Sequence, residues 1–316
     1  MNQDLVALDF KSLGTDIHAE IVLDTISREK KEEAKADLES LKNIYFAKQK
    51  IFNRFDLESE ISKINRKLKT FQEASADMLY LGKRILHYNE ISNGIFDPRV
   101  IGILENIGYD KDFKRKDFSA ANLPKKQAPL GGDLEKDLAI KDGKIYFGKK
   151  MDFSGVAKGY ITDCAAKFLK NQGWENFLVD SGGDMRIFGK NQDDENWKIE
   201  IEGIPKAKLM LEITDQGIAT SGISRKKWKI DGKKFHHLIN PKKPNQFSYE
   251  LRTVSVIAKN TEEADGRAKV LVLLGKENGM EFAAENKIAA VFLDYLGNVF
   301  VTSEAKKYIP THGPTG

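Results

Sequence analysis

Apolar and polar positions follow two different periods along this chain, and each period predicts its own kind of element. In residues 25–51, Ala34, Leu38, Leu41 and Tyr45 recur at steps of three and four among Lys and Glu residues. This spacing predicts a long amphipathic helix. Further helices are predicted at 76–88, from the glycine-rich stretch at 151–163 to about 171, at 262–274 and at 277–286, and the loop at 52–65 is expected to hold a short one.

Alternation at every second position predicts strands. The first is Thr15–Leu23, introduced by Leu13-Gly14-Thr15. Residues 177–187 are interpreted as two strand pieces broken by a Gly-Gly kink at 182–183. Further strands are predicted at 197–202, 209–214, 218–220, 228–230 and 253–257, and a closing hairpin joins 289–293 to 299–301 through Leu296-Gly297.

These elements predict an α+β fold in which a mixed, largely antiparallel sheet carries packed helices. We expect residues 1–316 to form a single domain. The polar segment 111–150 is interpreted as an irregular insertion that ends in a hairpin at Asp142-Gly143. The tail, residues 310–316, is expected to be frayed.

Composition and charge exclude several classes of function. Lys and Arg number 51 against 47 Asp and Glu, a net charge of only +4, which argues against a nucleic-acid partner. No apolar run reaches the roughly 20 residues of a transmembrane helix. The first residues carry no signal peptide or lipid-attachment motif. The chain as written is therefore expected to be cytoplasmic, or periplasmic or membrane-anchored if an N-terminal signal was removed.

The stretch 151–163 carries the strongest candidate chemistry. It is predicted to run from a strand end through a Ser-Gly turn into a helix, with Gly155 where the helix begins. N–H groups at a helix start lack internal acceptors and can face an anion. Asp152 and Lys158 flank this opening with opposite charges, so the pair could hold a polar ring edge and a phosphate of one ligand. The alternative is an ordinary strand-to-helix turn, with Asp152 as a cap and Lys158 in solvent.

Eight short motifs, in order along the chain, resemble those of the FAD:protein FMN transferases, the ApbE family. The motifs are Leu13-Gly14-Thr15, Phe55…Ser59-Glu60…Asn65, Ile95-Phe96-Asp97-Pro98, Asp152…Gly155…Lys158-Gly159-Tyr160…Asp163, Ser181-Gly182-Gly183-Asp184, Ala219-Thr220-Ser221-Gly222, His237-Leu238-Ile239-Asn240-Pro241 and Ala264-Asp265. The resemblance implies a T-fold-like architecture and a magnesium-dependent enzyme that moves the FMN half of FAD onto a Thr or Ser hydroxyl of a partner protein, releasing AMP. The implied partner is a separate acceptor, a flavoprotein subunit of a redox complex.

The resemblance also implies roles for individual residues. The FAD contacts that it implies are Leu13, Phe55, Ile95, Phe96, Asp97, Asp152, Lys158, Thr220, Ser221, Leu238 and Ile239. The implied magnesium ligands are Asp265 and the Gly155 carbonyl, with Lys269 at the position of the family's threonine ligand. Leu13 and Phe55 stand where the family usually has Met and Tyr.

Several residues depart from the family pattern. The expected Asp, Thr and Gly of the motif that begins at His237 are Asn240, Lys243 and Pro244. A Lys269 ammonium close to Asp265 could pair with that carboxylate and occupy the place of the cation. This change leaves two further hypotheses open: a non-catalytic FAD-binding protein, and an FAD pyrophosphatase in which water replaces the hydroxyl.

Four side chains besides Asp265 are candidates for the chemistry of phosphoryl transfer. His237 is the candidate general base, because an imidazole titrates near neutrality. Its neighbour His236 is expected to face the opposite side of a strand. Lys158 is the candidate for binding phosphate as a point charge. The hydroxyls of Thr220 and Ser221 could contact the diphosphate, or could only cap a turn, while Asp184 is expected to hold the Gly-Gly kink.

Overall fold

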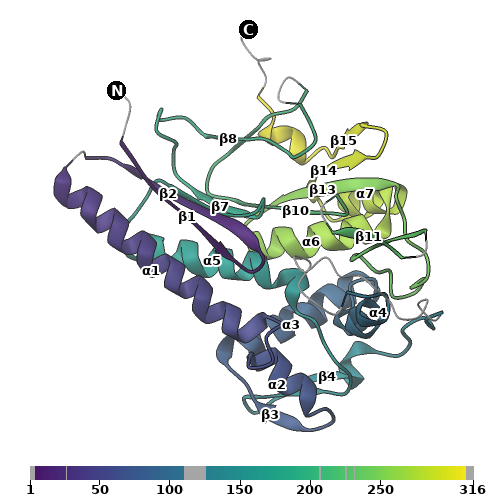
Figure 1. Cartoon of the computed structure of the whole chain (residues 1–316). Helices are drawn as coiled ribbons and strands as arrows, with labels where there is room; N and C mark the ends of the chain where they lie inside the picture. Colours follow the sequence, from purple (N-terminus) through teal and green to yellow (C-terminus); the bar gives the residue numbers. More distant parts are fainter. Residues whose placement is uncertain are drawn as a thin grey trace.

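The computed structural model describes residues 4–25, 27–109, 126–205, 208–224, 226–230 and 232–310. The predicted frayed tail lies almost entirely outside this part of the chain, as does the beginning of the predicted insertion. The central feature is an eight-stranded sheet (Figure 1), in the order β1-β2-β6-β7-β10-β13-β14-β15. Its strands are β1 Asp4–Ser12, β2 Thr15–Leu23, β6 Phe177–Ser181, β7 Met185–Phe188, β10 Gly217–Gly222, β13 Leu251–Ala258, β14 Ala289–Asp294 and β15 Val299–Val301.

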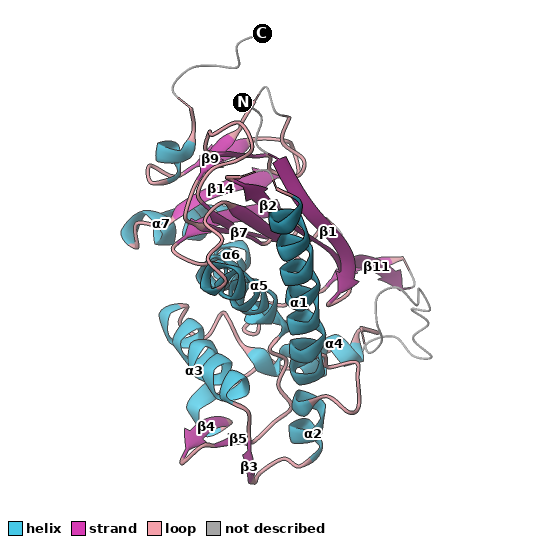
Figure 2. Ribbon diagram, turned by 90° about the vertical axis from the view of Figure 1, so that its left-hand side faces the viewer, coloured by secondary structure: helices cyan, strands magenta, loops and turns pink. Residues whose placement is uncertain are grey.

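Four helices cover one face of this sheet. They are α1 Arg28–Phe52, α5 Ser154–Asn171, α6 Thr261–Leu274 and α7 Lys276–Glu285. Figure 2 shows α1, α5 and α6 beside one another, and α5 contacts both of the other two. Helix α6 packs on β10 and β13, while α1 packs on β1 and β2. Helix α5 also contacts β6 and β7, so α5 and α6 both lie against the central strands of the sheet.

The remaining elements lie around this two-layer core. At the end of the molecule away from the sheet are α2, α3 and a three-stranded sheet of β3, β5 and β4 (Figure 1). The bounds are α2 Glu60–Arg66, β3 Phe71–Glu73, α3 Ala76–Ile91, η1 Pro98–Val100, α4 Ile101–Asn106, η3 Leu134–Lys136, β4 Leu138–Lys141, β5 Lys144–Phe147, β8 Trp197–Ile199, β9 Leu211–Ile213, β11 Lys227–Ile230, β12 Lys233–His236 and η4 Ala305–Tyr308.

The side chains of β14 show why the sheet needs two covering layers. Ala290 and Phe292 pack into the core beneath the helices, whereas Ala289, Val291 and Leu293 belong to a separate core on the other face. Side chains along a strand alternate between faces, so a strand with five successive apolar residues, here 289–293, must be covered on both faces. The second face is covered by apolar residues of β8 and β9.

Helices α5 and α6 approach unusually closely, which fixes the geometry of the site described below. Both carboxylate oxygens of Asp163 on α5 accept hydrogen bonds from the first N–H groups of α6, those of Thr261 and Glu262, at 2.9 and 2.8 Å. Gly159 makes the approach possible, since a Cβ there would lie 2.5 Å from the carbonyl oxygen of Thr261. The two helices therefore form one unit.

Most predicted elements are confirmed, including the α+β class, the long first helix and the hairpin at Asp142-Gly143. Strand β1 was not predicted, and it pairs with β2 over its whole length, so that Leu13-Gly14 is the turn of a hairpin. Leu13 and Gly14 have φ of 53° and 74°, the left-handed pair that a tight hairpin turn requires. Within the predicted irregular insertion, β4 and β5 form an ordered sheet with β3.

Candidate functional site

A cavity of about 1160 Å³ opens where the start of α5, the α6 helix, the β1–β2 turn and the ends of β6, β7 and β10 meet. It is lined by nearly all residues for which the sequence predicted a role: Leu13, Phe55, Phe96, Asp97, Asp152, Gly155, Lys158, Thr220, Ser221, His237, Leu238, Ile239, Asp265 and Lys269. Ile95 is not among the lining residues. A second, smaller cavity of about 380 Å³ borders His236 and Asn240.

Asp152 is fixed at the entrance to α5. Its Oδ1 accepts a hydrogen bond from the Ser154 N–H at 2.8 Å, and its Oδ2 lies 3.3 Å from Nε of Arg54 in a buried ion pair. Asp152 therefore caps the helix start, as the structural alternative anticipated, and still borders the cavity.

Sequence reasoning missed Arg54. Its guanidinium lies 4.2 Å from the ring centre of Phe55 and 4.6 Å from that of Tyr109, and its Nη2 donates to the Tyr109 carbonyl at 3.0 Å. Two aromatic rings and one carboxylate thus hold it at the cavity wall. The only sequence signal was its place beside Phe55 in the second motif.

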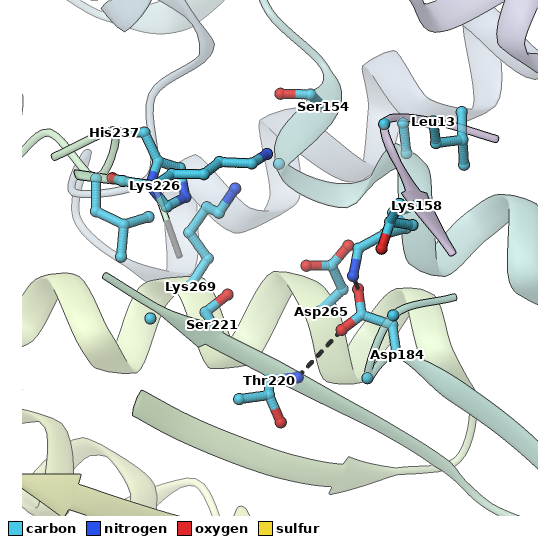
Figure 3. Close-up of a pocket in the computed structure, with 18 of the residues that line it drawn as sticks. Leu13, Ser154, Lys158, Asp184, Thr220, Ser221, Lys226, His237, Asp265 and Lys269 are labelled. Carbon is cyan, nitrogen blue, oxygen red and sulfur yellow. Dashed lines mark hydrogen bonds and ion pairs between the residues drawn. The ribbon is translucent and has the colours of Figure 1, made fainter. Parts of the chain in front are cut away.

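Lys158 points into the cavity from α5 and is held by Ser181, the last residue of β6, and by Asp184, the residue before β7. Its Nζ donates to the Ser181 carbonyl at 3.0 Å and forms an ion pair of 2.5 Å with Oδ2 of Asp184. Oδ1 of the same carboxylate accepts from the Thr220 N–H at 3.1 Å (Figure 3). The solvent-exposed role considered for Lys158 is therefore wrong.

Asp184 was expected to hold the Gly-Gly kink, and that expectation is also wrong. The Gly183 N–H at the kink donates instead to Asp180, at 2.6 Å. Asp184 joins Lys158 to the backbone of β10, and only 1% of its surface is exposed. No local pattern predicts these contacts, because Lys158 lies on a helix and Thr220 on a strand 36 positions from Asp184.

Asp265 is a buried carboxylate on α6 that faces the start of α5. Its Oδ2 accepts a hydrogen bond from the Gly159 N–H at 3.2 Å. Burial, together with the negative charge of Asp184, raises the pKa of Asp265 to about 7. A nearby cation would lower this raised pKa, because a positive charge stabilises the ionised form of the carboxylate.

Lys269 stands one turn further along α6 and was considered as an ion-pair partner of Asp265. The structure contradicts this. Among the described residues, the Lys269 ammonium forms no ion pair or hydrogen bond, and Figure 3 shows it beside Lys226 and His237 rather than at Asp265. Burial lowers the pKa of Lys269. Asp265 and Lys269 thus lie on the same helix, but the Lys269 side chain extends into the cavity instead of pairing with Asp265.

His237 follows β12 and lines the main cavity, whereas His236 borders the smaller one, so the two face opposite ways as expected. Burial, with the nearby charges of Lys226 and Lys269, holds the pKa of His237 well below its usual range. Its Nδ1 lies 3.4 Å from the Lys226 carbonyl oxygen. A carbonyl only accepts hydrogen bonds, which assigns the proton to Nδ1 and leaves the lone pair on Nε2.

Thr220 and Ser221 differ in orientation. The Thr220 hydroxyl is hydrogen-bonded across the sheet to Ser255 on β13, at 2.8 Å. Ser221, as the next residue of β10, faces the opposite side, that of α6 (Figure 3). Only the Ser221 hydroxyl therefore remains available to a ligand.

Asp97 borders the cavity, but its carboxylate is already engaged. Both oxygens bind the Arg99 guanidinium, at 2.7 to 3.2 Å, and Oδ1 accepts from the Arg99 N–H at 2.8 Å. The Asp97 side chain therefore caps η1. Beside it, the Phe96 ring lies about 3.1 Å from the position that a Cβ of Gly155 would take.

The oxygens at the α5–α6 contact fit a hard cation only in part. In a helix the Gly155 carbonyl lies at the Gly159 N–H, four residues on, and that N–H also contacts Asp265. The two predicted ligands therefore converge. Asp184 is neutralised by Lys158, and the described residues contain no group of three His, Cys, Asp or Glu that could hold a metal. Magnesium commonly takes one or two carboxylates and completes its shell with phosphates and water, and this donor set suits that arrangement.

A large cavity at helix starts and strand ends, with lysines, a neutral imidazole and a buried carboxylate, is the kind of site that binds a phosphate-bearing ligand. The comparisons with known proteins agree with this class. The profile of the ApbE family matches residues 13–292. The chain belongs to the ApbE family.

Relatives and solved structures match over most of the chain. The FAD:protein FMN transferase of Haemophilus influenzae is 26% identical over 96% of this chain and 90% of its own length. That of Vibrio cholerae is 30% identical over 75% and 72%. The apo form of the Pseudomonas stutzeri flavinyl transferase ApbE has a TM-score of 0.81 at 21% identity, covering 98% of this chain and 99% of its own. The ApbE protein of Thermotoga maritima reaches 0.83, covering 97% and 100% at 21% identity. These structures show that the fold is shared.

Proposed function

We propose that this chain is an FAD:protein FMN transferase, which moves the FMN half of FAD onto a Thr or Ser hydroxyl of an acceptor protein and releases AMP. The observation that carries the proposal is the convergence of Lys158, Asp265, Ser221 and His237 on one cavity. The proposal is also supported by relatives named FAD:protein FMN transferase, one of which aligns with 96% of the chain.

Phosphoryl transfer depends mostly on positioning and on charge neutralisation, and different residues of the cavity supply each. Lys158, fixed by Asp184, binds a phosphate oxygen. The acceptor hydroxyl attacks the phosphorus of the FMN phosphate, and the bond to the AMP phosphate breaks. His237 takes the hydroxyl proton on Nε2, because its lowered pKa keeps the imidazole neutral and able to accept.

Magnesium, when bound by Asp265 and the Gly155 carbonyl, would neutralise charge that develops on the diphosphate. The short contact between α5 and α6 keeps the Asp265 carboxylate and the Gly155 carbonyl oxygen close to each other. In the absence of FAD this partial donor set binds the ion weakly, since phosphate oxygens complete it.

Incubation of the protein with FAD, magnesium and a candidate acceptor tests the proposal. Release of AMP together with flavin covalently attached to the acceptor supports transfer. Release of AMP with free FMN indicates a pyrophosphatase, and intact bound FAD indicates a binding protein without transfer. Asp265→Ala is expected to abolish turnover, and Glu263→Gln on the same helix, whose partner is Arg267 outside the cavity, serves as the control.

One observation favours the second candidate, a flavin-binding protein that has lost transfer. Lys269 replaces an expected metal-side hydroxyl and carries its ammonium into the cavity. Asn240 does not compensate for the missing carboxylate, since its side chain accepts a hydrogen bond from the Lys242 N–H at 3.0 Å and closes a local turn. Intact FAD recovered after long incubation with magnesium would select this candidate.

A further inference from the structure

Lys269 places a positive charge in the cavity that no described carboxylate neutralises directly. It extends from α6 toward Lys226 and His237 (Figure 3). The three acids whose charges reach it or its neighbours are otherwise engaged: Asp152 with Arg54, Asp184 with Lys158, and Asp265 with the Gly159 N–H. Lys269 is half-buried, and a lysine that is withdrawn from solvent rarely lacks a partner for its charge.

The Lys269 ammonium lies close to Gly155, at the start of α5. A Cβ on Gly155 would lie 3.0 Å from its Nζ and 3.1 Å from the edge of Phe96. Glycine at this point of α5 therefore leaves the space that the ammonium fills. The charge is held against the start of a helix, where free N–H groups already favour an anion.

One further group, Lys226, makes the surroundings of Lys269 more positive. Lys226 lies close enough to lower the pKa of both Lys269 and His237. An anion between Lys269 and Lys226 would balance a charge that is otherwise costly to bury.

We propose that Lys269 and Lys226 form an anion site for a nucleoside diphosphate, so that the chain binds the diphosphate of FAD without a divalent metal. This inference rests on the proposed function for the identity of the ligand. It assigns to Lys269 a direct contact with phosphate, in place of a metal-side ligand.

The test is a titration of the full chain with FAD, ADP and riboflavin in the presence of a chelator and again with magnesium. We expect FAD and ADP to bind in the chelator, and riboflavin, which has no phosphate, to bind more weakly than FAD. Lys269→Met keeps the length of the side chain and removes the charge, so affinity for FAD and ADP should fall about ten- to a hundredfold, the value of a charge-assisted hydrogen bond. Affinity for riboflavin should not change.

Lys229→Met on β11 is the matched control, because Lys229 is exposed and does not line the cavity. A Lys269→Thr variant should bind FAD poorly in the chelator and recover when magnesium is added. Both variants are checked for native circular dichroism, and riboflavin binding shows that the cavity has kept its shape.

The inference is overturned if the wild-type protein binds FAD only with magnesium, or if Lys269→Met binds FAD and ADP as tightly as the wild-type protein in the chelator. In either case magnesium-dependent AMP release would leave the proposed function standing. If FAD does not bind under any condition, the proposed function fails as well.

Discussion

The contact between α5 and α6 gives the most direct prediction about the fold: Gly159→Ala should destabilise the protein. A Cβ at this position would lie 2.5 Å from the Thr261 carbonyl oxygen and 2.9 Å from Cα of Glu262. Both neighbours are backbone atoms, so they cannot turn away. Ordinary contact begins near 3.4 Å, which means that the two helices must separate by about 0.9 Å.

The size of the effect follows from three contributions. Overpacking of a tight contact costs about 1–3 kcal/mol. The hydrogen bond from the Gly159 N–H to Asp265 weakens, which costs about 1 kcal/mol more. Alanine in a helix gains about 1 kcal/mol over glycine. We therefore expect a net loss of about 2 kcal/mol in the free energy of unfolding.

Urea unfolding followed by circular dichroism measures this loss, and Gly155→Ala on the same helix is the matched control. The neighbours of a Cβ at Gly155 are the end of Lys269 and the edge of Phe96, at 3.0 and 3.1 Å, and the lysine can shift. The control should therefore keep wild-type stability within about 1 kcal/mol while its affinity for FAD falls. A Gly159→Ala protein as stable as the wild type would refute the description of the helix contact.

Three further predictions concern charge. Burial lowers the pKa of His236 to about 4. The stability that its neutral form provides is therefore complete above pH 6.5 and is lost as the pH falls through about 4, by about 3 kcal/mol in all. His236→Phe should flatten this acid dependence of the free energy of unfolding in urea, and an unchanged slope would contradict the assignment. Because the pKa of Asp265 is raised to about 7, magnesium affinity in the presence of FAD should rise as the pH increases through 7, and calorimetry that finds no such rise would exclude Asp265 as a ligand. Asp184→Asn keeps an acceptor for the Thr220 N–H but releases Lys158, so AMP formation should fall at least about tenfold with little loss of fold, and full activity would show that Lys158 needs no fixed partner.

Periodicity predicted the large elements because their burial is regular. The apolar positions of α1 show their period in the sequence alone. Strand β14 is marked instead by a run of five apolar residues, Ala289 to Leu293, and by the turn residues that follow it. Strand β1 was missed because four apolar residues in a row, Leu5 to Leu8, hide the alternation, and Leu5 and Ala7 are in fact exposed. The strand is held in place by its hydrogen-bonded pairing with β2, which the sequence of β1 alone does not predict.

The residues of the site were found more easily than their contacts. Fourteen of the positions predicted from the motifs line one cavity. The ion pair of Arg54 and Asp152 was not predicted, because the two residues are 98 positions apart and no local rule links them. Residues four apart on a helix are neighbours, which favoured a pair between Asp265 and Lys269. The structure gives Asp265 the Gly159 N–H instead, and the lysine extends into the cavity.

Helix α6 carries no transmembrane pattern, and no helix in the described part of the chain is long and apolar enough to span a bilayer. The compartment in which the chain acts stays a prediction. The acceptor protein is a proposal whose identity the cavity does not specify.

The proposed position of the diphosphate can be checked in a crystal structure of the protein with FAD. We expect the diphosphate to lie between the start of α5 and α6, within hydrogen-bond distance of Lys158 or Lys269 and next to Asp265. Electron density for FAD outside this cavity, or a diphosphate that contacts none of these side chains, would contradict it.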